Sequence, residues 1–263
     1  MHNRPIGVLD SGIGGLTVVR ELLRLLPNER IQFYSDSANC PYGNRTQSEI
    51  LGLIEHAFRF LEARNVKVIT LACNTISAAL DTSDKLTDIP LISIIEPAAR
   101  RVAADRLKAV GVIATEFTVA SRSYERQIAR FAPETAVFSK GSPLLAALID
   151  SGADDIAAID AEIRRQLPFV LSNGAVHEVV LGCTHYPIVL DRFQACYPDV
   201  VFIDPAHEEA LATQNALAAA GALADRPQGC LTIFTSGDPA GCRRACDKLG
   251  ISALTDVSIE QIR

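Results

Sequence analysis

The sequence predicts an α/β fold with mainly parallel sheets, built from two similar halves. Short runs of β-branched and aliphatic residues alternate with longer segments whose apolar residues recur with the period of a helix. Runs such as Val66–Thr70 and Glu178–Leu181 are almost continuously apolar, as in strands that helices cover on both faces. Several landmarks of the first half also recur, in the same order, in the second half. Together these observations indicate layers of helices around two parallel sheets.

The repeat places one cysteine at the end of a predicted strand in each half. Val68–Ala78 reads VITLACNTISA and Val179–Leu190 reads VVLGCTHYPIVL, so Cys73 and Cys183 each follow an apolar run and a small residue. If the halves face each other, the two thiols flank one cleft and reach one carbon centre from two sides. Two further landmarks recur, with Gly7–Leu9 matching Gly111–Ile113 and Ile95–Ala98 matching Ile203–Ala206.

The elements follow one another in strand–helix order, each bounded by turn-forming residues. The predicted strands are Ile6–Leu9, Ile31–Tyr34, Val66–Leu71, Leu91–Ile95, Ala109–Ala114, Ala136–Phe138, Glu178–Leu181, Val200–Ile203 and Leu231–Thr235. The predicted helices are Leu16–Leu26, Thr46–Arg64, Thr75–Leu86, Pro97–Leu107, Ala120–Phe131, Ile156–Leu171, Pro187–Cys196, Glu208–Ala224 and Ala240–Leu249.

The repeat also sets the expected domain boundaries. The first half covers residues 1–98 and the second covers residues 99–206. The tail, residues 207–263, has no counterpart within the second half. We therefore expect it to cross back, giving a discontinuous first domain of 1–98 plus 207–263 around a second domain of 99–206.

Composition excludes several classes of protein. The chain has 263 residues, 48% of them hydrophobic and 21% charged, which is ordinary for a globular protein. No apolar run approaches the ~18 residues of a membrane span, and the start of the chain does not resemble a signal peptide, so we expect a cytoplasmic protein. The net charge of −6 argues against nucleic acid as a partner.

The cysteines predict free thiols and no metal site. Seven is an odd number, and no C-x-x-C pair occurs. Cys242 and Cys246 are spaced for one face of a helix, but no histidine lies near enough in the sequence to complete a zinc set.

The residues that can perform chemistry lie at strand ends. Asp10 begins the glycine-rich segment Asp10–Gly15, which is either an anion cradle or a structural turn. A helix N-terminus lowers a thiol pKa from about 8.5 toward neutrality, and Cys73 and Cys183 both precede predicted helices. His185 lies two residues after Cys183 and, if it reaches the cleft, it can exchange a proton with Cys183 or activate it as a covalent nucleophile. The second alternative leaves Cys73 without a role.

Five motifs together resemble the cofactor-independent aspartate/glutamate racemase family. They are LDSGIGGLTV, YSDSANCPYG, ACNT, GCTHYP and TSGD, which run in this order over most of the chain. The resemblance implies two pseudo-symmetric α/β domains with the active site in the cleft between them. It also implies a homodimer that needs no cofactor and interconverts L- and D-glutamate, supplying D-glutamate for peptidoglycan.

The resemblance assigns roles to individual residues. Cys73 and Cys183 are the opposed acid and base, Asp10 assists Cys73, and His185 assists Cys183. Asp36 and Asp150 are further assisting acids, although the family usually has Glu at the position of Asp150, so its contact with His185 is an open question. The implied substrate-binding residues are Ser11, Pro41, Tyr42, Gly43, Asn74, Thr75, Thr115, Thr118 and Thr184.

Three other functions remain open on the sequence. An aspartate racemase of the same family differs only in substrate length, which the shape of the cleft determines. A Cys/His hydrolase would use Cys183 and His185 and would not need Cys73. A binding protein without turnover would not need to keep both thiols.

Overall fold

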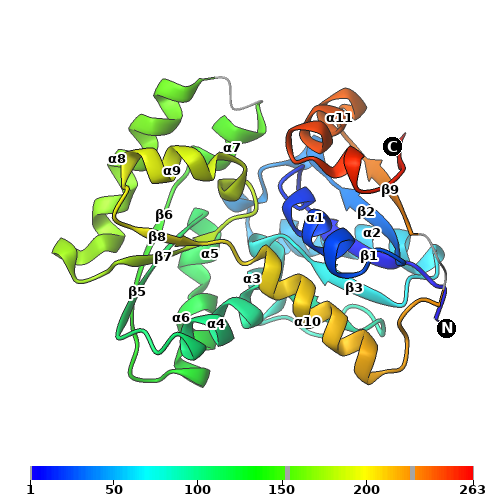
Figure 1. Ribbon diagram of the computed structural model, residues 1–263, viewed down its shortest axis with the longest axis horizontal. Coiled ribbons are helices and arrows are strands. Elements are labelled where there is room, and N and C mark those ends of the chain that lie inside the picture. The colour runs from blue at the N-terminus through cyan, green and yellow to red at the C-terminus, as the bar shows by residue number, and fades with distance from the viewer. Residues whose placement is uncertain (1, 152–154, 226–228, 263) are drawn as a thin grey trace.

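The computed structural model describes residues 2–151, 155–225 and 229–262, which form two lobes, each built on a β-sheet (Figure 1). One sheet has six strands and the other has four. Every described strand pair is parallel, so the predicted α/β class with parallel sheets is confirmed. Both chain ends lie on the lobe with the six-stranded sheet. None of the described helices is long and apolar enough to cross a membrane.

The six-stranded sheet takes its strands from both ends of the chain, in the order β10-β9-β2-β1-β3-β4. β9 pairs with β2 along its whole length, so the C-terminal tail returns to the first sheet. The domain boundaries at residues 98 and 206 themselves stay a prediction. The strands are β1 (Ile6–Asp10), β2 (Arg30–Ser35), β3 (Val68–Leu71), β4 (Leu91–Ser93), β9 (Cys230–Thr235) and β10 (Val257–Gln261).

The four-stranded sheet has the order β6-β5-β7-β8. This order matches the order β2-β1-β3-β4 in the first sheet. In each half of the chain, the strand that comes first in the sequence lies between the second and the third strands of that half. The internal repeat in the sequence is therefore a repeat of topology. The strands are β5 (Ala109–Ala114), β6 (Ala136–Gly141), β7 (Glu178–Gly182) and β8 (Val201–Ile203).

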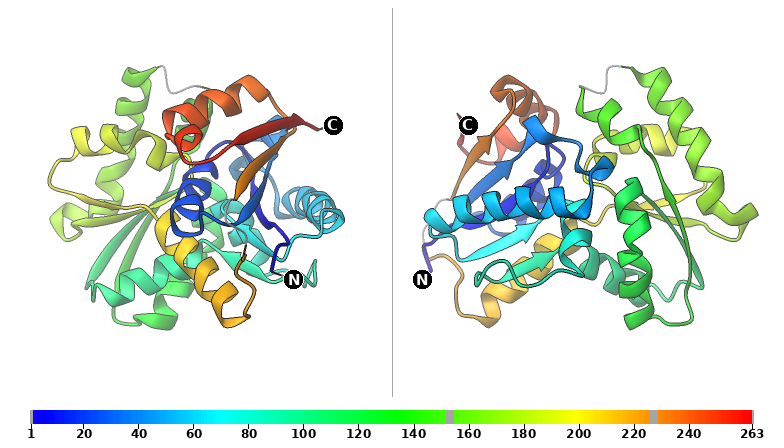
Figure 2. Two further views of the ribbon diagram at one scale, coloured as in Figure 1. Left: turned by 45° about the vertical axis from the view of Figure 1, so that its right-hand side comes forward. Right: turned by 180° about the vertical axis from the view of Figure 1, so that it is seen from behind.

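The helices cover both faces of the sheets (Figure 2). Local signals fix several of their ends: α2 begins with a capping box, in which Glu49 N–H donates to the Thr46 hydroxyl and Thr46 N–H to the Glu49 carboxylate. The helices are α1 (Leu16–Leu25), α2 (Gln47–Ala63), α3 (Asn74–Leu80), α4 (Ile95–Ala104), α5 (Glu116–Ser121), α6 (Ser123–Phe131), α7 (Leu145–Asp150), α8 (Ile156–Leu171), α9 (Leu190–Cys196), α10 (Ala206–Ala219) and α11 (Pro239–Lys248). The described residues also form short 3₁₀ segments, which are η1 (Ser37–Asn39), η2 (Tyr42–Asn44), η3 (Ser172–Gly174), η4 (Tyr186–Val189) and η5 (Ile251–Ala253).

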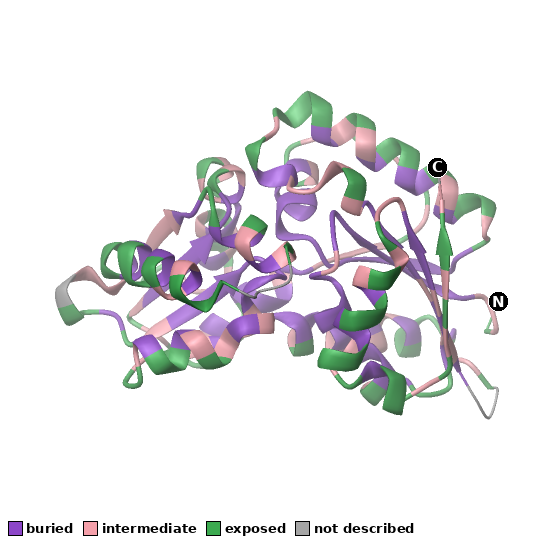
Figure 3. Ribbon diagram, turned by 90° about the horizontal axis from the view of Figure 1, so that it is seen from above, coloured by how far each residue is buried: buried purple, intermediate pink, exposed green. Residues whose placement is uncertain are grey.

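Side chains that alternate along a central strand such as β1 enter different apolar cores, and many exposed residues lie on the outer helices and loops (Figure 3). Val8 of β1 packs in the core that includes α1 and α10, whereas Leu9 packs in the core that includes α2 and α3. The first of these cores extends into the other lobe through Val110 of β5 and Tyr124 of α6. The lobes are thus joined by a shared core on one side, and the site described below lies where their strand ends meet.

Some elements differ from the sequence prediction. β10 and α7 were not expected, and the predicted helix Ala120–Phe131 is two helices, because Arg122 between them has a left-handed backbone with φ of 57°. The helix expected to run to Leu86 ends at Leu80, before turn-forming Asp81, Thr82 and Ser83. The helix expected to run to Ala224 ends at Ala219, before Gly221 with φ of 57°.

Candidate active site

The two places where strand order reverses open onto one cavity. In parallel sheets a ligand binds at the carboxyl ends of the strands at such a point. Here the reversals lie between β1 and β3 and between β5 and β7. Ser11, Cys73, Thr115 and Cys183 follow the ends of these four strands and line the cavity. The other residues that line it are Cys40, Pro41, Tyr42, Gly43, Asn74, Thr75, Ala146, Thr184 and His185.

Both predicted thiols therefore lie on the walls of this cavity. Cys73 and Cys183 are buried, with exposed fractions of 5% and 6%, and all seven cysteines of the chain are free. The volume of the cavity is about 10 Å³, which is the space of about one water molecule. In this arrangement the two lobes are closed tightly around the thiols.

The surroundings of Cys73 favour its protonated form. Its Sγ lies 3.4 Å from the hydroxyl of Ser11. Burial and the nearby negative charge of Asp10 raise the pKa of the Cys73 thiol to about 12. The lowered pKa that the helix N-terminus predicts is therefore wrong for Cys73, because burial outweighs the effect of the short helix α3. At neutral pH Cys73 is a proton donor.

Asp10 is fixed between the two lobes. One carboxylate oxygen accepts the N–H of Gly12 at 2.8 Å, and the other accepts the hydroxyl of Thr184 at 2.9 Å. The side chain is completely buried, and this burial raises the pKa of Asp10 to about 6, although His185 and the two hydrogen bonds oppose the rise. Asp10 therefore changes charge near the lower end of the physiological pH range.

His185 joins Cys183 to Asp150. Its Nδ1 lies 3.8 Å from Cys183 Sγ, and its Nε2 lies 2.9 Å from Asp150 Oδ1. Burial disfavours the charged ring, but the hydrogen bonds to Asp150, Cys183 and Cys40 outweigh it and raise the pKa of His185 well above its usual value. Protonated, the ring donates from both nitrogens, toward the thiol on one side and the carboxylate on the other.

The shorter side chain of Asp150 still reaches the histidine. Asp150 is the last residue of α7, which places its carboxyl group against the ring. Burial raises the pKa of Asp150, but the hydrogen bond and the charge of His185 lower it by more, so the net shift is downward. The departure from the usual Glu is thus compatible with the contact. Gly152, next but one in the sequence, lies outside the described residues.

The glycine-rich segment after β1 is a place of close approach between the lobes. A Cβ atom at Gly14 would lie 2.5 Å from the Thr184 hydroxyl and 2.8 Å from His185 Nδ1. A Cβ atom at Gly43 would lie 2.5 Å from the Cβ of Thr115. These glycines let backbone of the first lobe pack directly on site residues of the second.

A group of threonines connects the lobes on the other side of the cavity. The hydroxyls of Thr75 and Thr115 lie 3.0 Å apart, and that of Thr118 lies 2.9 Å from Thr115 and 3.5 Å from Thr75. Thr115 is also the N-cap of α5, where its side chain accepts the N–H of Thr118. Thr118 does not line the cavity itself and contacts it through the other two.

Asp36 supports the loop beside the cavity and is not one of the residues that line it. Its carboxylate accepts hydrogen bonds from the hydroxyls of Tyr42 at 2.5 Å and Ser236 at 2.7 Å, and from the amide of Asn39. These contacts hold the segment that carries Pro41, Tyr42 and Gly43 against β9.

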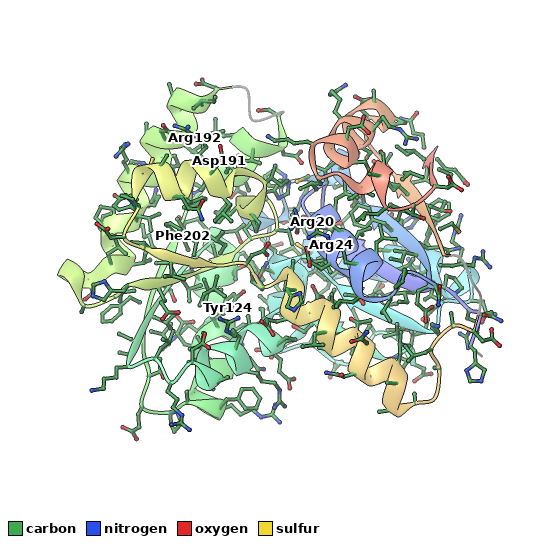
Figure 4. The ribbon with its side chains drawn as sticks, in the orientation of Figure 1. Arg20, Arg24, Tyr124, Asp191, Arg192 and Phe202 are labelled. Carbon is green, nitrogen blue, oxygen red and sulfur yellow. The ribbon has the colours of Figure 1, made fainter. Side chains whose placement is uncertain are left out.

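Two buried polar residues behind the site were missed by the sequence analysis. Tyr124, labelled in Figure 4, donates its hydroxyl to Asn74 Oδ1 at 2.7 Å and so fixes a cavity residue. Glu209 of α10 is fully buried, and neither carboxylate oxygen has a hydrogen-bond partner. Burial and the charge of Asp10 raise the pKa of Glu209 well above its usual value, so it stays neutral. No motif marks either residue, because both act from helix faces that read as ordinary core.

Among the described residues, no lysine lines the cavity. The five lysines lie elsewhere, and Lys67 is held by Glu29, with Nζ 2.8 Å from its Oε1. The site therefore offers no amine for a Schiff base with a carbonyl cofactor. The cavity is lined by three thiols, an imidazole and hydroxyl groups, and the carboxyl groups of Asp10 and Asp150 contact the lining residues Thr184 and His185.

Comparison with known proteins finds the same fold and the same family. Residues 6–213 match the model of the family described as Asp/Glu/Hydantoin racemase. A glutamate racemase of Herpetosiphon aurantiacus is 40% identical, over 91% of this chain and 95% of its own. The crystal structure of a glutamate racemase isoform from Bacillus anthracis superimposes with a TM-score of 0.89 at 30% identity, covering 100% of this chain and 98% of its own. That of glutamate racemase from Francisella tularensis in complex with D-glutamate also gives 0.89, at 32% identity and with the same two coverages.

Proposed function

Since this chain belongs to the Asp/Glu/hydantoin racemase family, we propose that it interconverts L- and D-glutamate by transferring protons through Cys73 and Cys183. The substrate follows from the relatives, which are named glutamate racemases at 34–40% identity over most of the chain. We further propose that it acts as a homodimer in the cytoplasm, that it needs no cofactor, and that its D-glutamate serves peptidoglycan synthesis. The family resemblance supports the homodimer, the lack of a cofactor and the role in peptidoglycan synthesis.

The observation that carries the proposal is the pair of thiols on one closed cavity between the lobes. Each thiol follows the strand that comes third in the sequence of its half, β3 or β7. The topological repeat therefore places the two thiols on opposite lobes. An α-carbon held between them would have one thiol on each face. Inversion of a stereocentre needs just this: one group to remove the proton and another to return one from the other side.

The neighbours of the two thiols suit the step from L- to D-glutamate. Cys183 Sγ faces the protonated ring of His185, which interacts most strongly with a thiolate, because hydrogen bonds to an ionised acceptor are the stronger ones. As a thiolate it takes the Cα proton of L-glutamate and becomes a thiol. The electron pair passes into the α-carboxylate group. Cys73, a thiol at neutral pH, then donates its proton to the opposite face of Cα.

The reverse step needs Cys73 as the base. The Cys73 thiol, with a pKa of about 12, passes its proton to the nearby carboxylate of Asp10. The protonated ring of His185 gives a proton to Cys183, so that Cys73 is the base and Cys183 the acid. The α-ammonium group of the substrate brings a positive charge into the same buried space, which stabilises a thiolate. The carbanion-like intermediate needs donors around the α-carboxylate, and Ser11, Asn74 and Thr75 line the cavity with such groups.

Glutamate is far larger than the water-sized cavity, so the lobes must separate to admit it. The contacts that have to part are polar or small: the hydrogen bond of Asp10 to Thr184 and the approaches of Gly14 and Gly43 to the other lobe. The apolar core that both lobes share, through Val110 and Tyr124, does not include these contacts. It can stay packed and act as the hinge while the lobes separate.

The alternatives explain less of this site. A Cys/His hydrolase would leave Cys73, with its neighbours Ser11 and Asp10, unused. A protein that only binds would have no need of the second thiol. The nearest competing hypothesis is aspartate as the substrate. The relatives compared above are named glutamate racemases, which favours glutamate.

Circular dichroism of the substrate tests the proposal. The purified protein, with no cofactor added, should abolish the optical signal of D-glutamate and of L-glutamate to the same racemic end point. D-aspartate under the same conditions should change at least about tenfold more slowly, since one methylene in a specific site changes binding by ~1–3 kcal/mol. Turnover of aspartate in preference to glutamate would overturn the assignment of substrate.

A further inference from the structure

Three potential metal ligands gather beside the cavity from three separate segments. They are Cys40, Asp150 and His185, and their ligand atoms all lie within 4.8 Å of one another. The three side chains surround Gly12. A Cβ atom at Gly12 would lie 3.0 Å from Cys40 Sγ, 3.2 Å from Asp150 Oδ1 and 3.3 Å from His185 Cε1. Among the described residues this is the one such group.

We propose that Cys40, Asp150 and His185 bind Zn²⁺ or a similar thiophilic divalent cation, and that the bound ion inhibits the enzyme. One sulfur, one imidazole nitrogen and one carboxylate oxygen form a ligand set that zinc accepts, with the fourth position left to water. The nitrogen is Nε2, which already faces Asp150 at 2.9 Å. Binding releases the thiol proton of Cys40 and the Nε2 proton of His185, so the ion replaces two protons.

An ion can reach the group from outside. The side chain of Asp150 is 26% exposed, and Cys40 is half-buried. Asp150 also lines a groove of about 320 Å³ between α7 and α11. Arg244 and Lys248 line the same groove, so binding depends on the three ligands rather than on a general negative potential.

The ligands belong to different lobes, which gives the inhibition its mechanism. Cys40 lies in the loop after β2 of the first lobe, whereas Asp150 and His185 belong to the second. An ion bound by all three ties the lobes together at the edge that must open for glutamate. The inhibitory part of the proposal rests on the proposed function, whereas the binding part does not.

Cobalt binding tests the site without reference to activity. Co²⁺ added to the protein under reducing conditions should produce the near-ultraviolet charge-transfer band of a cobalt–thiolate bond, and Zn²⁺ should remove that band. Cys40→Ala should lose it, and Asp150→Asn should weaken metal affinity by about tenfold or more. Cys230→Ala is the matched control, since Cys230 is the other half-buried cysteine and lies on β9. It should keep the band.

Racemase assays complete the test. Zn²⁺ should inhibit the wild type and Cys230→Ala, a chelator should reverse the inhibition, and Cys40→Ala should resist it relative to its own metal-free rate. A band that persists in Cys40→Ala and disappears in Cys73→Ala would place the metal on the catalytic thiols and overturn the proposal, as would no band in the wild type. A normal band in a protein that racemises no glutamate would instead contradict the proposed function and leave the metal site standing.

Discussion

Cys73→Ala and Cys183→Ala should each lower kcat by about 10²–10⁴-fold in both directions, because each direction needs one thiol as base and the other as acid. The loss should be equal within a few-fold whether the reaction starts from L- or D-glutamate. The measurement is the initial rate of optical change with each enantiomer, at saturating substrate.

Cys196→Ala serves as the control for loss of a buried cysteine. Cys196 is also buried, at 8% exposure, but it packs in the core of the second lobe at the end of α9. It should lower thermal stability while turnover stays close to that of the wild type. Substantial racemisation by Cys73→Ala would refute the assignment of two bases and favour the hydrolase.

Asp10→Asn removes activity and stabilises the folded protein at pH 8. Amide and carboxylate have nearly the same shape, so the amide oxygen can still accept the Gly12 N–H, while the amide N–H can donate to the Thr184 hydroxyl oxygen, which then acts as acceptor. The folded protein holds the Asp10 proton more tightly than the unfolded chain, with a pKa of about 6 against 3.8. Stability therefore falls as pH rises through this window, and Asn does not have this penalty. At pH 8 we expect a gain of ~1–3 kcal/mol in the free energy of unfolding.

Thermal unfolding at two pH values checks the sign. The melting temperatures of the wild type and Asp10→Asn should differ at pH 8 and approach each other at pH 4, where Asp10 is protonated in the folded protein. The kcat/KM of the wild type should fall as pH drops below about 6, as Asp10 loses the charge that accepts the Cys73 proton. A variant that is less stable than the wild type at pH 8 would show that Asp10 ionises in the fold without penalty.

The positions of the thiols could be predicted from the sequence because the repeat is topological. Residues after equivalent strands of a parallel sheet emerge at the same edge, so Cys73 and Cys183 had to lie at matching places. The shared strand order of the two sheets shows why this inference holds. The glycine-rich segment could not be interpreted in the same way, because the close contact of Gly14 with Thr184 joins segments far apart in the chain.

Other features depend on context that a single sequence does not contain. β10 has only Val257 and Ile259 as apolar residues and becomes a strand because β9 offers it an open edge. The apolar run that forms α7 fits a helix or a strand equally well by periodicity. Cys40 lies within the motif YSDSANCPYG but has no assigned role there, and it becomes relevant through its neighbours Asp150 and His185. Glu209 belongs to no motif and becomes relevant through its burial near Asp10.

Racemisation in D₂O is the most direct test of two bases on opposite faces. L-glutamate is incubated to low conversion, and deuterium at Cα is measured separately in the product and in the recovered substrate. The product D-glutamate should carry one deuterium at Cα from the first turnovers, while the recovered L-glutamate keeps its hydrogen, since the thiol that takes the proton does not return one to the same face. Deuterium that enters the recovered substrate as fast as the product would contradict the account, because it would require a single base that serves both faces.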